Sequence, residues 1–346
     1  MGMQPGDDGS LRPKTGFLTR MIPQMDELSR PGMPECTVEE YEPLLDSSDM
    51  GPEDWIKIAT TIEKNYYDYD GFVVIHGTDT MAYTASALSF MFSNLGKPVI
   101  IVGSMLPFGE VHSDARRNLA CSILIAGTCG LFLPEVCIFF NDRLLRGNRS
   151  TKVSSVAIGA FDSPNIPPLA YMGTDMSVND AIILPTPKGR LSVHRDLETR
   201  IMVLRLVPGF VDLEAILNSD VRGIVVLLYG TGNAPARRTA FINWVKALIG
   251  KGVVVVACSQ CLRGTVELED YAVGKQLHEA GVISALDMTC EAAVTKMAYL
   301  LPMKMPADEF RTAFQTPLRG ELSTKKEHSN FIKQLSNPSA VPLSRL

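Results

Sequence analysis

FVVIHGTDTMAYTASAL, residues 72–88, is the stretch of sequence that decides the fold. Phe72 to Ile75 is a short, partly β-branched apolar run of the kind that a parallel sheet buries on both faces, and Gly77 marks the turn that ends it. Residues 78–80 are polar and precede a helical pattern, so they can cap a helix whose free N–H groups attract a carboxylate. Ligands of open α/β sheets bind at the carboxyl ends of strands. The stretch therefore predicts either a ligand site or a plain cap and turn.

Strand-like and helical patterns alternate along most of the chain, which is typical of a parallel α/β sheet. The expected helices cover residues 55–66, 84–92, 118–126, 237–250, 271–280 and 291–301, and the expected strands cover 72–75, 98–102, 135–140, 223–229 and 253–258. We expect a large N-terminal α/β domain over residues 1–183 and a smaller C-terminal α/β domain over 205–322. A linker at 184–204, which contains Pro185 and Pro187, joins them, and a polar tail follows at 323–346.

Composition limits the class of protein. The chain has 346 residues, of which 46% are hydrophobic, so it is long enough for two cores. The net charge of −5 is spread without a basic stripe, so no nucleic-acid partner is expected. The longest apolar stretches, such as Gly252 to Cys258, have the length of a strand, so no membrane span is expected. The amino terminus shows neither a signal peptide nor a myristoylation site.

The seven cysteines are odd in number and scattered, which argues against a disulfide framework and for a reducing compartment. A cytoplasmic location is therefore expected. Cys258 and Cys261 have the spacing of a metal knuckle or a redox pair, but no second pair accompanies them. Ordinary buried thiols are favoured, and neither a metal nor a cofactor is expected.

Four separated motifs carry a family resemblance. They are DSSDM at 46–50, HGTDT at 76–80, RGNRSTK at 146–152 and YGTGNAP at 229–235. In this order they resemble the cytosolic, type I branch of the L-asparaginase family. The resemblance covers nearly the whole chain, up to about Glu321. It implies the asparaginase fold, with a large α/β domain followed by a smaller one, assembled as a homodimer or homotetramer.

The resemblance implies that Thr78, Asp79 and Lys152 form the second catalytic triad of that family. A Thr hydroxyl becomes a useful nucleophile or water-orienting group when a neighbouring amine accepts its proton, and burial that lowers the pKa of a lysine allows this. Asp79 would hold Lys152 and also bind the amino group of the substrate. The alternative for Lys152 is an ordinary surface lysine.

Asp46, Ser47 and Ser48 correspond to the loop that binds the substrate carboxylate, and a helix cap ahead of Glu53 is compatible with the same residues. Tyr271 lies where mammalian-type relatives place a catalytic tyrosine that reaches the neighbouring protomer, and it also fits as a core residue of its helix.

The resemblance also raises the question of an effector site of the kind found in bacterial type I enzymes. Thr151 and Cys261 lie near the position of such an asparagine-binding activator site. Leu227 and Ala257 stand where those enzymes carry Arg and Asn, so an allosteric response of that kind is not expected.

The sequence departs from the family pattern at its start. The family begins with a buried strand that ends in Thr-Gly-Gly-Thr-Ile-Gly-Met, and its second Thr is the nucleophile. Gly2 and Met3 match the end of this motif, and no TGGT stretch occurs in the printed sequence. Loss of such a nucleophile costs on the order of 10⁶ in turnover, and loss of a sheet strand leaves unpaired backbone groups. We expect either a truncated gene model or an inactive isoform.

The leading functional prediction is hydrolysis of L-asparagine to L-aspartate and ammonia through a Thr acyl-enzyme. A second hypothesis is that the chain is the amidase subunit of a tRNA amidotransferase, but the sequence does not show the amino-terminal barrel of that subunit. A non-catalytic binder of asparagine or aspartate, or a partner in mixed oligomers, is the alternative from a different class. Ester hydrolysis has no support from a G-x-S-x-G motif.

Overall fold

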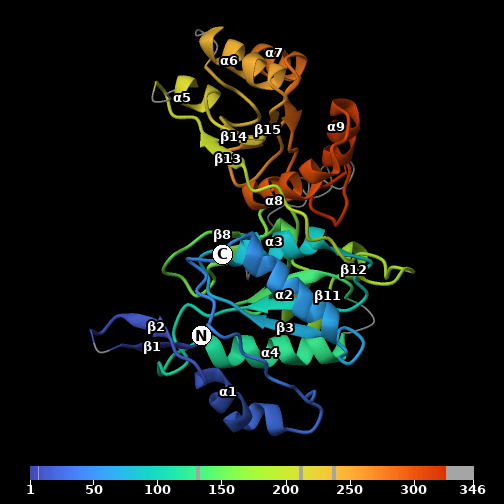
Figure 1. The fold of residues 1–346 in the computed structure, drawn as a ribbon. Coiled ribbons are helices and arrows are strands. Elements are labelled where there is room, and N and C mark those ends of the chain that lie inside the picture. Colours follow the sequence, from blue (N-terminus) through green and yellow to red (C-terminus); the bar gives the residue numbers. More distant parts are fainter. Residues whose placement is uncertain (7, 130–132, 210–212, 236–238, 325–346) are drawn as a thin grey trace. The chain divides into compact units, whose positions relative to one another are not determined.

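The computed structural model describes residues 1–6, 8–129, 133–209, 213–235 and 239–324 (Figure 1). Its contacts divide the chain into two compact units. Unit 1 comprises Met1–Ser163 and Pro167–Arg195, and unit 2 comprises Pro164–Ile166 and Asp196–Leu346. The predicted domain limits remain predictions, and the predicted tail lies outside the described residues from 325 onward.

Unit 1 is built on a six-stranded sheet in the order β11-β10-β7-β6-β5-β3. The strands are β3 (Phe72–Ile75), β5 (Val99–Val102), β6 (Val136–Phe140), β7 (Arg143–Arg146), β10 (Ala170–Met172) and β11 (Met176–Val178). The first three are parallel, whereas β7, β10 and β11 are antiparallel to their neighbours. The predicted parallel pairing is present among β3, β5 and β6, and the three further antiparallel strands make the sheet of unit 1 a mixed one.

The switch from parallel to antiparallel pairing occurs at a two-residue turn. Asn141 and Asp142 connect β6 to β7, and both have positive φ angles, 47° and 59°. Two successive residues in this region form the hairpin turn that matches the twist of paired strands, and Asn and Asp tolerate it well. The turn sends β7 back along β6, so a crossover helix is not needed here.

Helices cover both faces of this sheet. Helix α4 (Ala115–Thr128) contacts β3, β5 and β6, and α3 (Met81–Met91) contacts β6 on the opposite face, where α2 (Pro52–Asn65) packs on α3 (Figure 1). Ten of the eleven residues of α3 are buried, which explains its apolar and small-residue sequence. All four residues of β5 are buried, as a strand covered on both faces requires.

The remaining elements of unit 1 are short. They are β1 (Met3–Pro5), β2 (Leu11–Pro13), α1 (Phe17–Met21), η1 (Ile22–Gln24), η2 (Asp26–Ser29), β4 (Phe92–Ser93), η3 (Gly147–Arg149), β8 (Thr151–Lys152), β9 (Phe161–Asp162), η4 (Asp180–Ile182) and β12 (Ser192–Val193).

Unit 2 contains a four-stranded parallel sheet in the order β13-β14-β15-β16. Its elements are β13 (Ile201–Arg205), α5 (Leu213–Leu217), β14 (Gly223–Leu228), α6 (Thr239–Gly250), β15 (Val254–Ser259), α7 (Ala272–Glu279), β16 (Ile283–Ser284), α8 (Cys290–Leu300), η5 (Leu301–Met303) and α9 (Ala307–Gln315).

Alternate residues of β14 enter two different cores. Ile224 and Val226 belong to the cluster that includes α6 and α7, whereas Val225 belongs to the cluster that includes α8 and α9. Side chains of a strand point to opposite faces in turn, so both faces of this sheet are covered. The continuous apolar run at 223–228 is therefore a strand buried on both sides.

A buried ion pair closes the second of these cores. Lys296 of α8 pairs with Glu321, and both side chains are 0% exposed. Lys296 also donates to the carbonyl oxygens of Phe314 and Thr316 at 2.6 and 2.7 Å. Glu321 accepts hydrogen bonds from the backbone N–H groups of Leu318 and Arg319. These bonds hold the segment that follows α9 against α8.

The predicted elements match the structure closely. The strand at 72–75 is confirmed to the residue as β3, and each of the other predicted strands and helices has a counterpart. The largest differences are of three residues, at the starts of α2, α3 and α4, which begin at Pro52, Met81 and Ala115 instead of residues 55, 84 and 118. No helix among the described residues combines the length and the apolar character that crossing a membrane requires.

Candidate active site

Three predicted residues meet at the carboxyl end of β3. Thr78 and Asp79 lie in the loop between β3 and α3, and Lys152 is the last residue of β8. Lys152 Nζ lies 2.9 Å from Thr78 Oγ1 and 2.8 Å from Asp79 Oδ1. The Lys152 side chain is 23% exposed and that of Asp79 is 65% exposed. The interpretation of Lys152 as an isolated surface lysine is wrong, because it joins a hydroxyl and a carboxylate from a loop 73 and 74 positions away.

The 46–48 loop lies against the same turn. Thr80 Oγ1 donates to the carbonyl oxygen of Ser47 at 2.6 Å. A Cβ added to Gly77 would lie 2.2 Å from Ser47 Oγ, so only glycine lets the two loops approach this closely. Asp46 Oδ1 accepts from Ser48 N and Oγ at 3.0 and 2.9 Å, which fixes the loop from within.

Two capping interpretations fail here. Thr80 is the N-cap residue of α3, but its side chain makes no capping hydrogen bond and binds Ser47 instead. The 46–48 loop does not cap α2, whose N-cap residue is Gly51; there, the Asp54 carboxylate accepts from Gly51 N at 3.0 Å. The polar residues of both loops are therefore directed to one another and to the space around Lys152.

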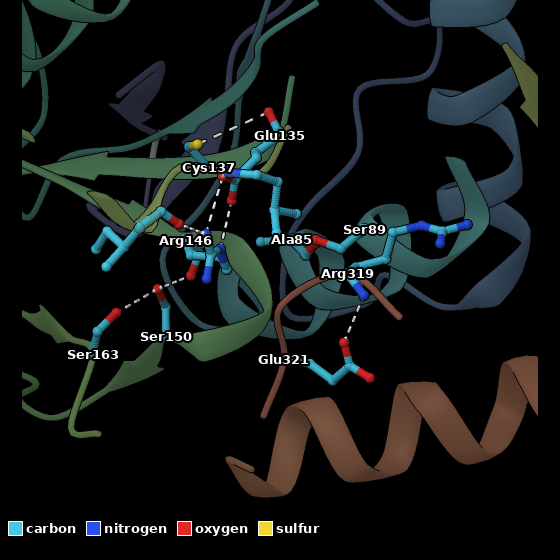
Figure 2. Close-up of polar contacts among 11 residues, drawn as sticks. Ala85, Ser89, Glu135, Cys137, Arg146, Ser150, Ser163, Arg319 and Glu321 are labelled. Carbon is cyan, nitrogen blue, oxygen red and sulfur yellow. Dashed lines mark hydrogen bonds and ion pairs between the residues drawn. The ribbon is translucent and has the colours of Figure 1, made fainter. Parts of the chain in front are cut away.

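A buried ion pair supports the chain segment that delivers Lys152 (Figure 2). Arg146, at the end of β7, donates to both oxygens of Glu135 at 2.5 and 3.0 Å, and the side chains are only 8% and 2% exposed. Glu135 Oε1 also accepts from Leu184 N at 2.6 Å. Ser150 Oγ donates to the Arg146 carbonyl at 2.7 Å and lies 3.5 Å from Ser163 Oγ.

Gly147 follows this pair in a narrow space. A Cβ there would meet the carbonyl oxygens of Val136 and Ala85 at 2.8 and 3.2 Å. The segment from β7 to β8 is thus packed between the sheet and α3. This packing sets the position from which Lys152 reaches Thr78.

His76 belongs to the HGTDT motif, was assigned no role from the sequence, and has buried polar partners. Its side chain is 5% exposed, and its ring nitrogens contact Gly77 O at 2.6 Å and Thr84 Oγ1 at 2.9 Å. Burial lowers the pKa of His76, and the bond to Gly77 O offsets part of that effect. A histidine directly before a turn of functional residues was the available signal, but its side-chain partner, Thr84, lies on helix α3, whose position spacing alone does not give.

The remaining predicted residues are Tyr271, the two cysteines at 258 and 261, and Thr151, which was considered for an effector site. Tyr271 is the N-cap residue of α7 in unit 2 and is 50% exposed, so the interpretation as a core residue is wrong. Cys258 is buried in β15, as predicted, whereas Cys261 is exposed. Thr151 is buried in unit 1. The structure therefore brings together Ser47, Thr78, Asp79 and Lys152 within unit 1, and it describes Tyr271 and Cys261 only within unit 2.

Comparisons with known proteins agree on one family. The model "Asparaginase, N-terminal" matches residues 1–184, and the model "Glutaminase/Asparaginase C-terminal domain" matches residues 200–314. L-asparaginase 1 of Escherichia coli K12 is 44% identical over 325 residues, covering 93% of this chain and 95% of that protein. The 60 kDa lysophospholipase of Mus musculus is 42% identical over 83% of this chain, which spans 51% of that longer protein.

A solved structure extends the agreement to the fold. The crystal structure of L-asparaginase I from Vibrio cholerae has a TM-score of 0.84 and 43% sequence identity, and the match covers 93% of this chain and 96% of that one. Family models match both halves of the sequence, and the relatives exceed 40% identity over most of its length. The chain therefore belongs to the asparaginase family.

Proposed function

We propose that this protein is an amidohydrolase that converts L-asparagine to L-aspartate and ammonia. The observation that carries the proposal is the contact of Lys152 Nζ with both Thr78 Oγ1 and Asp79 Oδ1 at the end of β3. A hydroxyl between a lysine and the substrate space is the arrangement that proton transfer to and from an attacking hydroxyl or water requires.

The reaction has two steps. A Thr hydroxyl attacks the side-chain amide, and the C–N bond breaks as ammonia leaves with a proton. Water then attacks the acyl-enzyme ester, and the Thr leaves with the returned proton. Thr78 orients the water, and Lys152 exchanges the proton that Thr78 passes on. The family supplies the acyl-forming Thr from a TGGTIG motif that the printed sequence does not contain.

Substrate recognition follows from the same loops. The Asp79 carboxylate is 65% exposed and offers its second oxygen to the α-amino group of the substrate. Ser47 supplies donors for the α-carboxylate from the loop that packs on Gly77, and Ser48, through its bonds to Asp46, holds this loop in shape. Tyr271 of a neighbouring protomer completes the site in this proposal, and its half-exposed position at the start of α7 is compatible with that role.

Assembly and location complete the proposal. We propose a homodimer or homotetramer, because Val153, Val156 and Ile158 follow Lys152 and are exposed by 42%, 87% and 39%. Exposed apolar groups that cluster beside a site mark an interaction surface. Light scattering on the purified protein gives the number of chains. A cytoplasmic location is supported by the seven cysteines, all of which are free thiols.

Ammonia release from L-asparagine by two purified proteins tests the proposal. One is the chain as printed, and the other, called the extended form, carries a family-type strand ending in TGGTI before Gly2. Turnover by the extended form alone supports the acyl-enzyme mechanism. Two folded but inactive proteins would refute hydrolysis, and binding of L-aspartate to them would favour the non-catalytic binder. L-glutamine in the same assay gives the substrate preference.

A further inference from the structure

Behind the 76–80 turn, three side chains from three elements form a buried chain of hydrogen bonds. Trp55 Nε1 of α2 donates to Thr84 Oγ1 of α3 at 3.0 Å. Thr84 Oγ1 lies 2.9 Å from His76 Nε2, and His76 Nδ1 lies 2.6 Å from Gly77 O. Thr84 is 0% exposed and His76 is 5% exposed. The chain therefore ends on the backbone carbonyl directly before Thr78.

The partners fix where each proton lies. Gly77 O only accepts, so His76 Nδ1 must carry a proton and donate it. The Nε2 of a neutral imidazole then only accepts, so the Thr84 hydroxyl donates to it. The Thr84 oxygen in turn accepts the Trp55 N–H. One arrangement satisfies every group, and the opposite tautomer would place the Nδ1 lone pair against a carbonyl oxygen at 2.6 Å.

A charged imidazole does not fit this chain. Protonation would give Nε2 a hydrogen that meets the Thr84 hydroxyl, and the Thr84 proton would have to leave its present acceptor. Desolvation is the main cause of the lowered pKa of His76, and the two side chains that complete the chain, Trp55 and Thr84, are uncharged at neutral pH. Both ring nitrogens are thus engaged and buried, which excludes His76 as a general base.

The peptide geometry links this chain to the site. In a trans peptide the carbonyl and the following N–H point in opposite directions. Holding Gly77 O on the imidazole therefore turns the Thr78 N–H away from His76. Thr78, whose hydroxyl contacts Lys152, is the residue that follows this peptide.

We propose that His76 is a positioning residue: as the Nδ1–H tautomer held by Thr84 and Trp55, it fixes the Gly77–Thr78 peptide and so sets the Thr78 hydroxyl against Lys152. The role in turnover rests on the proposed function. The tautomer of His76 and its effect on the loop are independent of the proposed function.

The first test is spectroscopic and needs no activity. The 346-residue chain is labelled with ¹⁵N-histidine, and long-range ¹H–¹⁵N correlation spectra are recorded from pH 8 down to pH 5.5, with His76→Asn for assignment. The expected result is a neutral Nδ1–H ring at His76 throughout this pH range. An Nε2–H tautomer, or protonation of His76 within the range, would overturn the proposal.

A matched pair of variants tests the effect on the site. An Asn amide nitrogen occupies about the position of His Nδ1, so His76→Asn keeps the donor to Gly77 O, whereas His76→Gln keeps the contact to Thr84 and loses that donor. In whichever form turns over, His76→Gln lowers kcat about 100-fold with little change in KM, since a displacement of about 1 Å costs that much. His76→Asn keeps most of kcat although its Tm falls as well.

Thr84 supplies the second pair. Thr84→Val is nearly isosteric but leaves Trp55 Nε1 and His76 Nε2 without their partner, and it lowers kcat, whereas Thr84→Ser keeps the hydroxyl and the activity. Equal losses of kcat in His76→Asn and His76→Gln, in proportion to their Tm, would show a merely structural histidine. Inactivity of both protein forms would refute the proposed hydrolysis and leave the tautomer test intact.

Discussion

Among the residues that the structure describes, two lysine–carboxylate pairs of nearly the same chemistry lie in very different surroundings. Lys152 and Asp79 lie 2.8 Å apart, with side chains 23% and 65% exposed, whereas Lys296 and Glu321 are both 0% exposed. Charges in water gain little from pairing, while a charge left alone in the interior is costly. The exposed pair is therefore suited to meet a substrate, and the buried pair is suited to hold a chain segment.

The partners of the two lysines agree with this division. Lys152 contacts a hydroxyl and a carboxylate that retain access to solvent, whereas Lys296 is enclosed by Glu321 and two backbone carbonyls. Burial lowers the pKa of Lys296, and the neighbouring Glu321 offsets part of that effect. A contact with a carboxylate thus does not by itself mark a functional lysine. The two lysines differ in their access to solvent.

The largest expected effect is on turnover. In the extended form, Lys152→Met lowers kcat by about 10³- to 10⁴-fold, because it removes the group that exchanges a proton with Thr78. Steady-state ammonia release measures it. The free energy of unfolding changes by less than about 1 kcal/mol, since the pair is exposed. A Lys152→Met protein that retains full kcat would show that Lys152 takes no part in turnover.

The next effect is on stability. Lys296→Met destabilises unit 2 by about 3–5 kcal/mol, because the buried Glu321 carboxylate loses the ammonium group with which it pairs. The two tryptophans lie one in each unit, so urea unfolding is followed by Trp244 fluorescence in a Trp55→Phe background. The double variant Lys296→Met with Glu321→Leu is more stable than the single one. Equal midpoints for Lys296→Met and Lys152→Met would contradict the buried role.

A smaller effect is expected at the contact between the two site loops. Gly77→Ala places a methyl group 2.2 Å from Ser47 Oγ, so the 46–48 loop must shift. L-aspartate affinity falls by about 10-fold, or ~1.4 kcal/mol, while the buried pair of unit 2 is unaffected. Calorimetric titration measures the affinity, and Gly51→Ala, where a Cβ meets nothing within 4 Å, is the matched control. Unchanged binding would show that the loop does not hold the ligand.

The mildest test concerns pH. The pKa of His76 is lowered in the folded protein, so below the ordinary histidine value the unfolded chain binds more protons than the folded one. Stability from this residue is present above about pH 6.5 and is lost as the pH falls through the lower folded value, by at most about 1.4 kcal/mol per pH unit. Urea midpoints between pH 7 and 5 measure the slope. His76→Gln is expected to remove it, and an unchanged slope in that variant would assign it to another group.

The sequence was a good guide to elements formed by local patterns. The apolar run at 72–75 predicted β3 to the residue, because four successive β-branched and aromatic residues favour a strand. The antiparallel strands were missed, because the turn at Asn141 and Asp142 depends on two positive φ angles that alternating hydrophobicity does not reveal.

The site was predicted in part, and only through the family. Thr78, Asp79 and Lys152 were named from motifs, since no spacing rule joins residues so far apart in the chain. His76, Thr84 and Trp55 were missed as a group, because their connection depends on how two helices lie over one strand end. Sequence spacing predicts which residues are neighbours on one helix or strand. Contacts between different elements depend on tertiary packing, which spacing does not reveal.

The turn between β6 and β7 also bears on the order of folding. Phe140 and Arg143 pair at a separation of three positions in the sequence, whereas Lys152 and Thr78 meet at a separation of 74. A hairpin forms in about 1–10 μs, but contacts between distant positions wait for the intervening chain to be ordered. Refolding followed at the hairpin would therefore run ahead of refolding followed by ligand binding. We therefore expect the Thr78–Lys152 contact to form late in folding, so that its appearance would report the completion of unit 1.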